Sequence, residues 1–538
     1  MRLSRKTRIA LTGAGLALAL TAAAVTGRGD AASAPHPGPV PNIDWTVAGH
    51  DISNTRDAAG ERLLGPTTVS RLTPAWSVSA AGGLSVTPAD DGATLYYPDL
   101  AGQFWAVAAN TGQVRWSHSI TDYTGTAGDV VRDSPAVHGN ELVFGDSTFT
   151  AMAGARVLAV DKRTGAKLWQ TVVDAYPVAT VTSSPVIIGD TIYVGISSSE
   201  EFIAVKPGYH CCSFRGSVVA LDARTGRILW QTHTVPAGYS GGGVWGSTPA
   251  VDPRAGLLYV ATGNNYSVPD GICDAPNQQG CSMPVRANHA DSIMALDMAT
   301  GAIRWATPTI ADDVYTAKCD SATQAGCGSD FDFASGPNLI RLPSGRMLVG
   351  VGQKSGVYWA LDPHTGKVVW HTPIGPGSTE GGIQWGSATD GSRIYVAIGN
   401  YFGKPYQIRT AHGAPSTIAG GSWAALDAAT GRILWQVADP QQAADIGYVT
   451  TANGVVYAGS TASTGDTMYA LDAANGRILW RFASGTPVVS GTAIVHGWLY
   501  WGSGFKLGTA CPTGQGPMRV CINRIGRMFA FHLPANSR

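Results

Sequence analysis

Two short stretches of the sequence hold side chains that could do chemistry together. Glu200 and Glu201 stand shortly before the adjacent cysteines Cys211 and Cys212 in "EEFIAVKPGYHCC", and a second acidic pair occurs in "SDFDFASGPNL". Carboxylate oxygens are the ligands that a hard cation such as Ca²⁺ prefers. A carboxylate can also take a proton as a general base. These acids could therefore form a metal site with acid–base function, or they could lie in ordinary solvated loops.

A hairpin with a closing tryptophan recurs along the chain and must position these stretches. The unit is a short apolar strand, a turn of the Asp/Asn-x-x-Thr-Gly type and a second strand ending in tryptophan, as in "VVALDARTGRILW" and "YWALDPHTGKVVW". Glycine supplies the positive φ of the turn, and Asp or Asn accepts backbone hydrogen bonds. The closing residues are Trp116, Trp169, Trp230, Trp305, Trp370, Trp435 and Trp480.

A second type of hairpin precedes each of these units. Eight such hairpins run from "LSVTPADDGATLYYPD" to "GTAIVHGWLYWGS". Paired in this way, the hairpins predict an all-β protein, an eight-bladed β-propeller with four strands in each blade. The last blade has no tryptophan-ended strand after "RMFAFHLP", but "LTPAWSV" around Trp76 can supply one. We therefore predict that the N-terminal strand closes the ring and that residues 35–538 form a single propeller.

The long insertions of this propeller are predicted to share one face. Strands alternate in direction within a blade, so second-to-third-strand loops and blade-to-blade connections lie on the same side. The insertions are 199–215, 265–290, 401–421 and 504–525 of the first kind and 306–336 of the second. All eight cysteines lie in or beside them. For the last six cysteines, local disulfides are the economical pairing: Cys273–Cys281, Cys319–Cys327 and Cys511–Cys521.

The N-terminal segment predicts export. Basic residues between Arg2 and Arg8 precede the apolar run "IALTGAGLALALTAAAVTG" and the small-residue stretch "DAASA". This order is typical of a secretory signal peptide, so we expect residues 1–34 to be removed and the protein to be secreted; a membrane anchor is the alternative. No later segment has the about 20 apolar residues that a spanning helix needs. Basic and acidic residues balance at 37 each, and no basic stripe indicates a nucleic-acid partner.

The repeats, the opening "GHDISNTRDA…TTVSRLTPAW" and the paired cysteines together resemble the alcohol dehydrogenases that depend on pyrroloquinoline quinone (PQQ). Within them, the chain is most similar to the polyvinyl-alcohol-dehydrogenase-like group. By this resemblance, Glu200 in "VGISSSEE" and Asn264 in "YVATGN" bind the metal ion. Trp245 in "GGGVWGSTPA" would lie under the quinone, and Lys354 in "GQKSGVYWALD" near the quinone oxygens. Arg132 in "VVRDSPAV" would be a second basic contact.

The acidic pair Asp330 and Asp332 matches the segment that holds the catalytic base of the family. Side chains two residues apart point to the same side of a strand, so both are candidates. With Asp332 as base, Ala334 follows two positions later, the pattern of the calcium enzymes, and Asp332 would also bind the metal. With Asp330 as base, Asp332 stands in that place, which is the lanthanide pattern. We favour Asp332 with Ca²⁺.

The adjacent cysteines are predicted to form a disulfide with each other. Neighbouring Cα atoms are closer than those of most disulfide partners, so Cys211 and Cys212 would close a tight ring. The resemblance implies that this ring covers the quinone face opposite the tryptophan. In methanol dehydrogenase the pair precedes the metal-binding glutamate, whereas here it follows Glu200. The alternative is that each cysteine is bonded elsewhere.

These features predict a secreted quinoprotein that oxidises an alcohol, with polyvinyl alcohol or another secondary or polymeric alcohol as substrate. PQQ would accept the hydride, and the metal would act as a Lewis acid. Electrons would pass to an external acceptor, a cytochrome c or a quinone, because the sequence has no CxxCH haem motif. The alternative is a non-catalytic propeller that serves as a binding or assembly scaffold. A scaffold has no need of these acids, Trp245 and Lys354 on one face.

Overall fold

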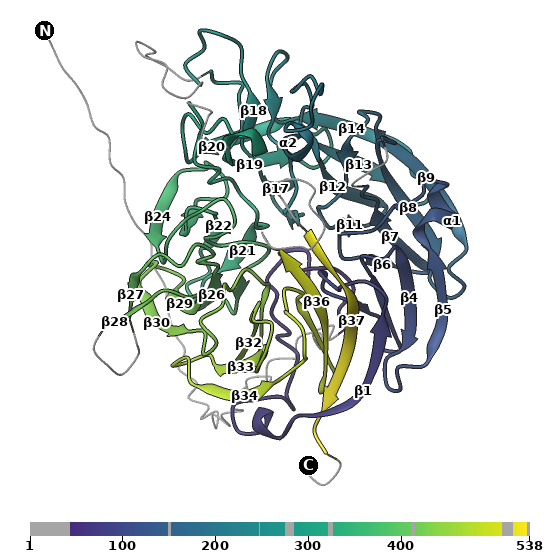
Figure 1. Cartoon of the computed structure of the whole chain (residues 1–538), viewed down its shortest axis with the longest axis vertical. Coiled ribbons are helices and arrows are strands. Elements are labelled where there is room, and N and C mark those ends of the chain that lie inside the picture. Colours follow the sequence, from purple (N-terminus) through teal and green to yellow (C-terminus); the bar gives the residue numbers. More distant parts are fainter. Residues whose placement is uncertain are drawn as a thin grey trace, which may run out of the picture. The chain divides into compact units, whose positions relative to one another are not determined.

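The computed structural model describes residues 44–148, 152–246, 248–274, 285–320, 326–409, 415–507 and 520–534; the predicted signal segment 1–34 lies outside them. Eight antiparallel sheets surround a common centre as the blades of a propeller (Figure 1). Each blade contains four strands, and blade 3 has one additional short strand. The predicted all-β, eight-bladed architecture is therefore confirmed.

The first four blades follow the chain order. Blade 1 contains β2 (Ala89–Asp90), β3 (Thr94–Pro98), β4 (Gln103–Ala108) and β5 (Val114–Ser119). Blade 2 contains β6 (Ala136–His138), β7 (Glu141–Gly145), β8 (Ala155–Asp161) and β9 (Lys167–Asp174). Blade 3 contains β10 (Ala179–Thr180), β11 (Val186–Ile188), β12 (Thr191–Ser198), β13 (Ser217–Asp222) and β14 (Ile228–His233). Blade 4 contains β16 (Ala250–Asp252), β17 (Leu257–Ala261), β19 (Ser292–Asp297) and β20 (Ile303–Pro308).

The remaining blades continue the ring and return to the N-terminal strand. Blade 5 contains β21 (Asn338–Arg341), β22 (Met347–Gly352), β23 (Val357–Leu361) and β24 (Val368–Pro373). Blade 6 contains β25 (Ala388–Thr389), β26 (Arg393–Ile398), β29 (Ser422–Asp427) and β30 (Ile433–Ala438). Blade 7 contains β31 (Val449–Ala452), β32 (Val455–Gly459), β33 (Met468–Asp472) and β34 (Ile478–Phe482). Blade 8 contains β35 (Thr492–Val495), β36 (Trp498–Leu507), β37 (Val520–His532) and β1 (Thr73–Ala80).

The closing tryptophan of each repeat contacts the turn of the next blade. Trp305 donates its indole N–H to the Pro363 carbonyl oxygen at 2.9 Å. Its ring also lies against Gly366, where an added Cβ would come within 2.5 Å of the indole and where φ is +68°. Trp435 makes the equivalent bond to the Ala473 oxygen at 3.0 Å. The Thr-Gly turn and the tryptophan are thus two halves of one contact between blades, which explains why they recur together.

The N-terminal strand closes the ring as predicted. Within the β1–β37 pair, Trp76 stands opposite Ala530 and Ser77 opposite Phe529. Trp480, the last closing tryptophan, donates its indole N–H to the Leu72 oxygen at 3.1 Å, just before β1. The eighth blade is therefore built from an N-terminal and three C-terminal strands, and β1 and β37 lie side by side in Figure 1.

The insertions lie where the strand order requires. We call the side with the second-to-third-strand loops and the blade connections the insertion face. It carries α2 (Glu200–Ile203), η2 (Ala317–Asp320), and the small sheets β15 (Ser240–Gly241) with β18 (Asn265–Ser267) and β27 (Tyr406–Ile408) with β28 (Ser416–Ile418). Cys319 and Cys327 form the predicted disulfide, with Cα atoms 5.8 Å apart. The predicted pairs of Cys273 with Cys281 and Cys511 with Cys521 involve residues outside the described part.

Two further helical turns complete the fold, α1 (Ile120–Thr124) in the connection to blade 2 and η1 (Val69–Arg71) before β1. Among the residues that the structure describes, no helix has the length and apolar character needed to cross a membrane.

A single arginine from the N-terminal segment lies among the inner ends of several blades. Arg56 is 1% exposed. Its guanidinium carbon is 4.3 Å from the centroid of the Tyr448 ring, and Nη1 donates to the Thr87 hydroxyl at 3.2 Å. A Cβ on Gly386 would come within 2.5 Å of Arg56 Nε, so this position must lack a side chain. Burial lowers the pKa of Arg56 to about 10.

Candidate active site

A buried cluster of one lysine and two aspartates lies on the insertion face. Lys354 lies in the loop that begins directly after β22. Asp330 and Asp332 come from the connection between blades 4 and 5. The Lys354 ammonium is 2.9 and 3.0 Å from the two carboxylate oxygens of Asp330 and 2.9 Å from Oδ1 of Asp332. All three residues are buried. The structure thus brings together the acid pair and the lysine that the sequence singled out.

Trp245 holds the second oxygen of Asp332. Its indole N–H donates to Asp332 Oδ2 at 2.7 Å, and its ring centroid is 5.1 Å from Lys354 Nζ. The Trp245 carbonyl oxygen accepts a hydrogen bond from the Thr182 hydroxyl at 2.8 Å. The Asp332 carboxylate is therefore oriented from two sides, by an indole and by an ammonium. The sequence did not predict this contact between the tryptophan and the acid.

The acid pair does not lie in a strand, so the strand expectation is wrong. Residues 330–334 form no strand, and Asp330 has a φ of +53°. The backbone N–H groups of Asp330 and Phe331 donate to the Asp313 carboxylate at 2.8 and 2.7 Å. This buried carboxylate bends the chain tightly, and both carboxylates of the pair still face Lys354. Turn geometry, rather than strand alternation, places them on one side.

The cluster holds more acidic than basic groups. Burial and nearby carboxylates raise the pKa of Glu201 to about 8, and burial raises the pKa of Asp330 well above its ordinary value. Burial would lower the pKa of Lys354, but the surrounding carboxylates raise it above the ordinary value. Asp291 is 3% exposed, and no donor among the described residues reaches its Oδ1. Buried, mutually repelling carboxylates fit a hard, multiply charged cation.

The two adjacent glutamates have different environments. The Glu200 carboxylate is completely buried and accepts hydrogen bonds from the hydroxyls of Tyr176 at 2.5 Å and Tyr209 at 3.0 Å. It also accepts from the backbone N–H groups of Ser213 at 3.0 Å and Phe214 at 2.8 Å. Glu200 therefore fixes the chain directly after the cysteine pair. Its expected role as a metal ligand competes with these four donors.

Glu201, rather than Glu200, is the glutamate whose charge interacts with the Lys354 cluster. Its ionisation is opposed by burial and by Asp332, and is favoured by Lys354. Both glutamates lie on α2, where successive side chains are turned by about 100° because a helix has 3.6 residues per turn. The Glu200 side chain therefore supports a loop, whereas the side chain of the next residue, Glu201, faces the Lys354 cluster. The ligand expected from the sequence was Glu200 and not Glu201.

Gly263, the residue before Asn264, lies close to the Asp332 carboxylate. A Cβ added to Gly263 would be 3.1 Å from Asp332 Oδ2. The buried Asn264 amide donates to the carbonyl oxygens of Asn265 at 2.9 Å and Tyr315 at 3.0 Å. These bonds fix the orientation of the amide and turn its oxygen away from both carbonyls. The role of Asn264 as a metal ligand stays a prediction.

Cys211 and Cys212 are joined to each other by a disulfide across a cis peptide bond. Their sulfurs and a Glu200 carboxylate oxygen lie within 4.8 Å of one another. Cys212 also packs against the buried cluster that contains Phe214 and Tyr266. The disulfide is thus held in a defined position by the loop that Glu200 anchors.

Arg132 belongs to an aromatic group deeper in the propeller. Burial raises the pKa of Tyr448, and the nearby charges of Arg56 and Arg132 partly oppose that rise. Burial lowers the pKa of Arg132 to about 10. The Tyr448 ring is 6.2 Å from Trp385, whose ring meets Trp245 edge-on at 5.6 Å. A continuous aromatic series therefore connects the arginines to the Asp332 site. Trp385 was missed, although "QWGS" repeats the "VWGS" of Trp245 and could have revealed it.

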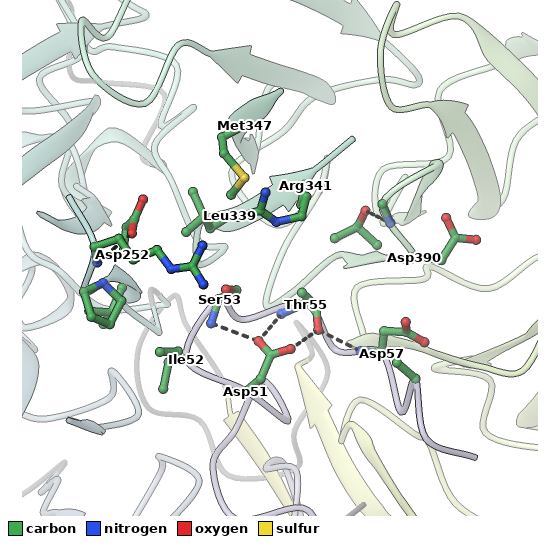
Figure 2. Close-up of a pocket in the computed structure, with 16 residues that line it drawn as sticks. Asp51, Ile52, Ser53, Thr55, Asp57, Asp252, Leu339, Arg341, Met347 and Asp390 are labelled. Carbon is green, nitrogen blue, oxygen red and sulfur yellow. Dashed lines mark hydrogen bonds between the residues drawn. The ribbon is translucent and has the colours of Figure 1, made fainter. Parts of the chain in front are cut away.

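A separate cavity of about 370 Å³ lies among first-to-second-strand turns, on the face opposite the insertions (Figure 2). Asp51 accepts hydrogen bonds there from the Ser53 and Thr55 backbones and from the Thr55 hydroxyl at 2.6 Å. Burial, followed by repulsion from Asp390, raises the pKa of Asp57 to about 7. None of the lining residues belongs to the Lys354 cluster.

Comparison with known protein families identifies the propeller. Residues 45–382 match the PQQ family model described as the β-propeller domain of glucose, ethanol and alcohol dehydrogenases. The chain belongs to this PQQ dehydrogenase family. A second PQQ-type model, described as outer membrane protein assembly factor BamB, matches residues 353–487. The first match includes Glu201, Trp245, Asn264 and Asp332, which lie outside the second, and Lys354 lies within both.

Individual relatives agree with this membership in the PQQ dehydrogenase family. The chain is 33% identical to a polyvinylalcohol dehydrogenase of Pseudomonas sp over 70% of its own length, and 34% identical to one of Sphingopyxis sp. (strain 113P3) over 68%. It spans 60% and 55% of the lengths of these relatives. A europium-containing methanol dehydrogenase has the same fold, with a TM-score of 0.66, 18% identity and coverage of 91% of this chain and 98% of the other.

Proposed function

We propose that this protein oxidises alcohols with PQQ as hydride acceptor and a metal ion, Ca²⁺ or a lanthanide, as Lewis acid. The substrate class is that of secondary and polymeric alcohols such as polyvinyl alcohol. The observation that carries the proposal is the Asp332 carboxylate, buried and oriented by the indole of Trp245 and the ammonium of Lys354. Membership in the PQQ dehydrogenase family and the names of the relatives support it.

The side chains around Asp332 fit the cofactor and the metal. Oxygen ligands for the metal would come from Glu201, Asn264 and Asp332, with Glu201 replacing the Glu200 of the sequence prediction. Trp245 and the Cys211–Cys212 disulfide would cover the flat faces of the quinone. When bound, PQQ supplies a hydride acceptor and the metal polarises its carbonyl group.

Asp332 would take the proton of the substrate hydroxyl as general base. Trp245 and Lys354 keep its carboxylate in one orientation, which favours a single proton-transfer geometry. The Lys354 ammonium, held charged by the surrounding carboxylates, would stabilise negative charge that develops on a neighbouring oxygen. Arg132, behind the aromatic series, would add to the positive potential on that side of the site. Asp330 would share Lys354 and remain a candidate base for the lanthanide form.

The working environment follows from the cysteines and the N-terminal segment. Disulfides at Cys211–Cys212 and Cys319–Cys327 suit an oxidising compartment. We propose that residues 1–34 direct secretion and that electrons leave to an external acceptor, a cytochrome c or a quinone. The absence of a CxxCH motif from the sequence supports an acceptor outside this propeller.

Reconstitution tests the proposal directly. Purified protein is loaded with PQQ and either Ca²⁺ or a lanthanide, and alcohol-dependent reduction of an artificial dye is measured. We expect activity only when both PQQ and a metal are present. Asp332→Asn should retain PQQ, seen by its absorbance, but lose turnover. A protein that neither retains PQQ nor reduces the dye with any metal would be a scaffold, and the proposal would be wrong.

A further inference from the structure

A second cavity opens on the insertion face, at the junction of blades 6 and 7. Its volume is about 400 Å³. Its walls are the loop after β26 (400–403), the connection from β30 to β31 (442–444) and the loop after β32 (461–463). These are the same kinds of connection that carry Glu201, Asp332 and Lys354 in the earlier blades. The cavity therefore repeats the position of the Lys354 cluster farther around the ring.

A short backbone segment, 377–382, links the cavity to the Lys354 cluster. The Ser378 N–H donates to the Lys354 carbonyl oxygen at 3.3 Å. At the other end, the Gly382 carbonyl oxygen accepts a hydrogen bond from the Gly399 N–H at 2.8 Å. Gly399 stands directly before Asn400, a wall of the cavity. The cavity and the Lys354 cluster are therefore joined through one short segment of backbone.

The lining of the cavity has no charged side chain. Polar groups come from Asn400, Gln442, Thr461 and Ser463, and most other lining residues are alanine or glycine. The Thr461 hydroxyl donates its proton to the Ala444 oxygen at 2.6 Å, so its remaining lone pairs serve as acceptors. Gln442 likewise donates its amide to the Asp439 oxygen at 3.0 Å, which leaves its own oxygen as an acceptor. Such a lining fits a neutral ligand that donates hydroxyl protons.

An exposed aromatic side chain is adjacent in sequence to the lining of the cavity. Phe402 is 57% exposed and stands between two lining residues, Tyr401 and Gly403. Its ring meets Tyr401 edge-on at 5.5 Å. An aromatic face beside neutral acceptors suits a ligand with alternating methylene and hydroxyl groups.

We propose that this cavity is a subsite for a neutral polymeric secondary alcohol. One segment of the polymer occupies the cavity while a hydroxyl farther along the chain reaches Asp332. This inference rests on the proposed function and adds to it how a polymer is distinguished from a small alcohol. Engagement at two places raises the effective concentration of hydroxyl groups at the reacting site. A small alcohol gains nothing from the cavity.

Filling the cavity tests the subsite. Ser463 is exposed at the cavity wall, so Ser463→Trp should fill the space without disturbing the core. The matched control is Ser344→Trp, an exposed position in the β21–β22 turn on the opposite face. Binding of fluorescently labelled polyvinyl alcohol oligomers to the PQQ- and Ca²⁺-loaded protein is measured by fluorescence anisotropy. We expect Kd to rise about tenfold in Ser463→Trp, equivalent to about 1.4 kcal/mol, and to stay unchanged in Ser344→Trp.

Two further readouts separate the subsite from the proposed activity. The ratio of the polymer KM to the 2-butanol KM should rise about tenfold in Ser463→Trp, in line with the loss of binding. Polyethylene glycol, which has no hydroxyl groups along its chain, should not compete with the labelled oligomers. Equal oligomer binding by wild type and Ser463→Trp, or full competition by polyethylene glycol, would refute the subsite. If binding depends on Ser463 but no alcohol is oxidised, the subsite stands and the proposed function fails.

Discussion

Replacing either of the adjacent glutamates with glutamine separates a structural from a metal-binding role. In Glu200→Gln, an amide nitrogen takes the place of one carboxylate oxygen. If it replaces Oε2, the Phe214 N–H loses its 2.8 Å acceptor; if it replaces Oε1, the hydroxyls of Tyr176 and Tyr209 lose theirs. The second orientation costs least, because a tyrosine hydroxyl can turn to accept from the amide, but the remaining hydrogen bonds then lose their charged acceptor. We therefore expect the free energy of unfolding to fall by about 1.5–3 kcal/mol.

Glu201→Gln should have the opposite effect. Burial and nearby carboxylates already disfavour its charge, so an uncharged side chain should leave the free energy of unfolding unchanged or increase it. It removes a proposed ligand, however, and metal affinity should fall at least about tenfold, since even groups that only support ligands are worth 10–100-fold. Glu200→Gln should change the metal affinity much less.

Two measurements on both variants decide between these roles. Urea unfolding gives the stability, and terbium(III) titration, followed by luminescence excited through the tryptophans, gives the metal affinity. Wild type and the double variant provide the controls. If Glu200→Gln loses metal binding at unchanged stability while Glu201→Gln binds normally, the assignment to Glu201 is wrong and the original sequence prediction is right.

Four other variants test the base, the ring closure and the opposite face. Asp332→Asn should lower kcat by about 100- to 10,000-fold while PQQ stays bound, and Asp330→Asn should keep measurable activity with Ca²⁺; the reverse pattern with lanthanide-only activity would make Asp330 the base. Deleting residues 70–80 should abolish cooperative unfolding because it removes β1, and a soluble, cooperative product would contradict the closure. The pKa of Asp57 is raised to about 7, so the folded state holds its proton more tightly and this contribution to stability is lost as pH rises from about 4 through 7. Asp57→Asn should therefore show a smaller fall in urea midpoint between pH 5 and pH 8 than wild type, and an equal fall would refute the argument.

The fold could be predicted because its main contacts are encoded locally. A tryptophan such as Trp305 and the glycine it packs on, Gly366, belong to adjacent repeats, so each repeat carries both partners of the contact between blades. Counting repeats was therefore equivalent to counting blades. The unpaired "RMFAFHLP" segment then revealed the one pairing between distant parts of the chain.

The site was predicted in composition but not in geometry. Trp245, Asp332 and Lys354 come from three different connections, and nothing in their spacing indicates that the indole N–H reaches the carboxylate. Glu200 was preferred to Glu201 because counting along a sequence ignores the rotation of a one-turn helix. The strand expected at Asp330 is absent because the backbone there donates a hydrogen bond to the carboxylate of Asp313, a residue outside the local motif. Long-range polar contacts of this kind leave no periodic signal.

The closure of blade 8 also sets the order in which the chain can mature. The pairing of Thr73 with His532 joins residues 459 positions apart, and at 5–20 residues per second β1 must wait roughly 20–90 s for its partner during synthesis. An unpaired strand invites association with other chains over that time. β1 contains Pro74, and its register shifts between Pro74 and Trp76, both of which weaken pairing with a foreign strand. The irregular start of β1 thus lowers the tendency of the nascent chain to associate with other chains before β37 has been synthesised.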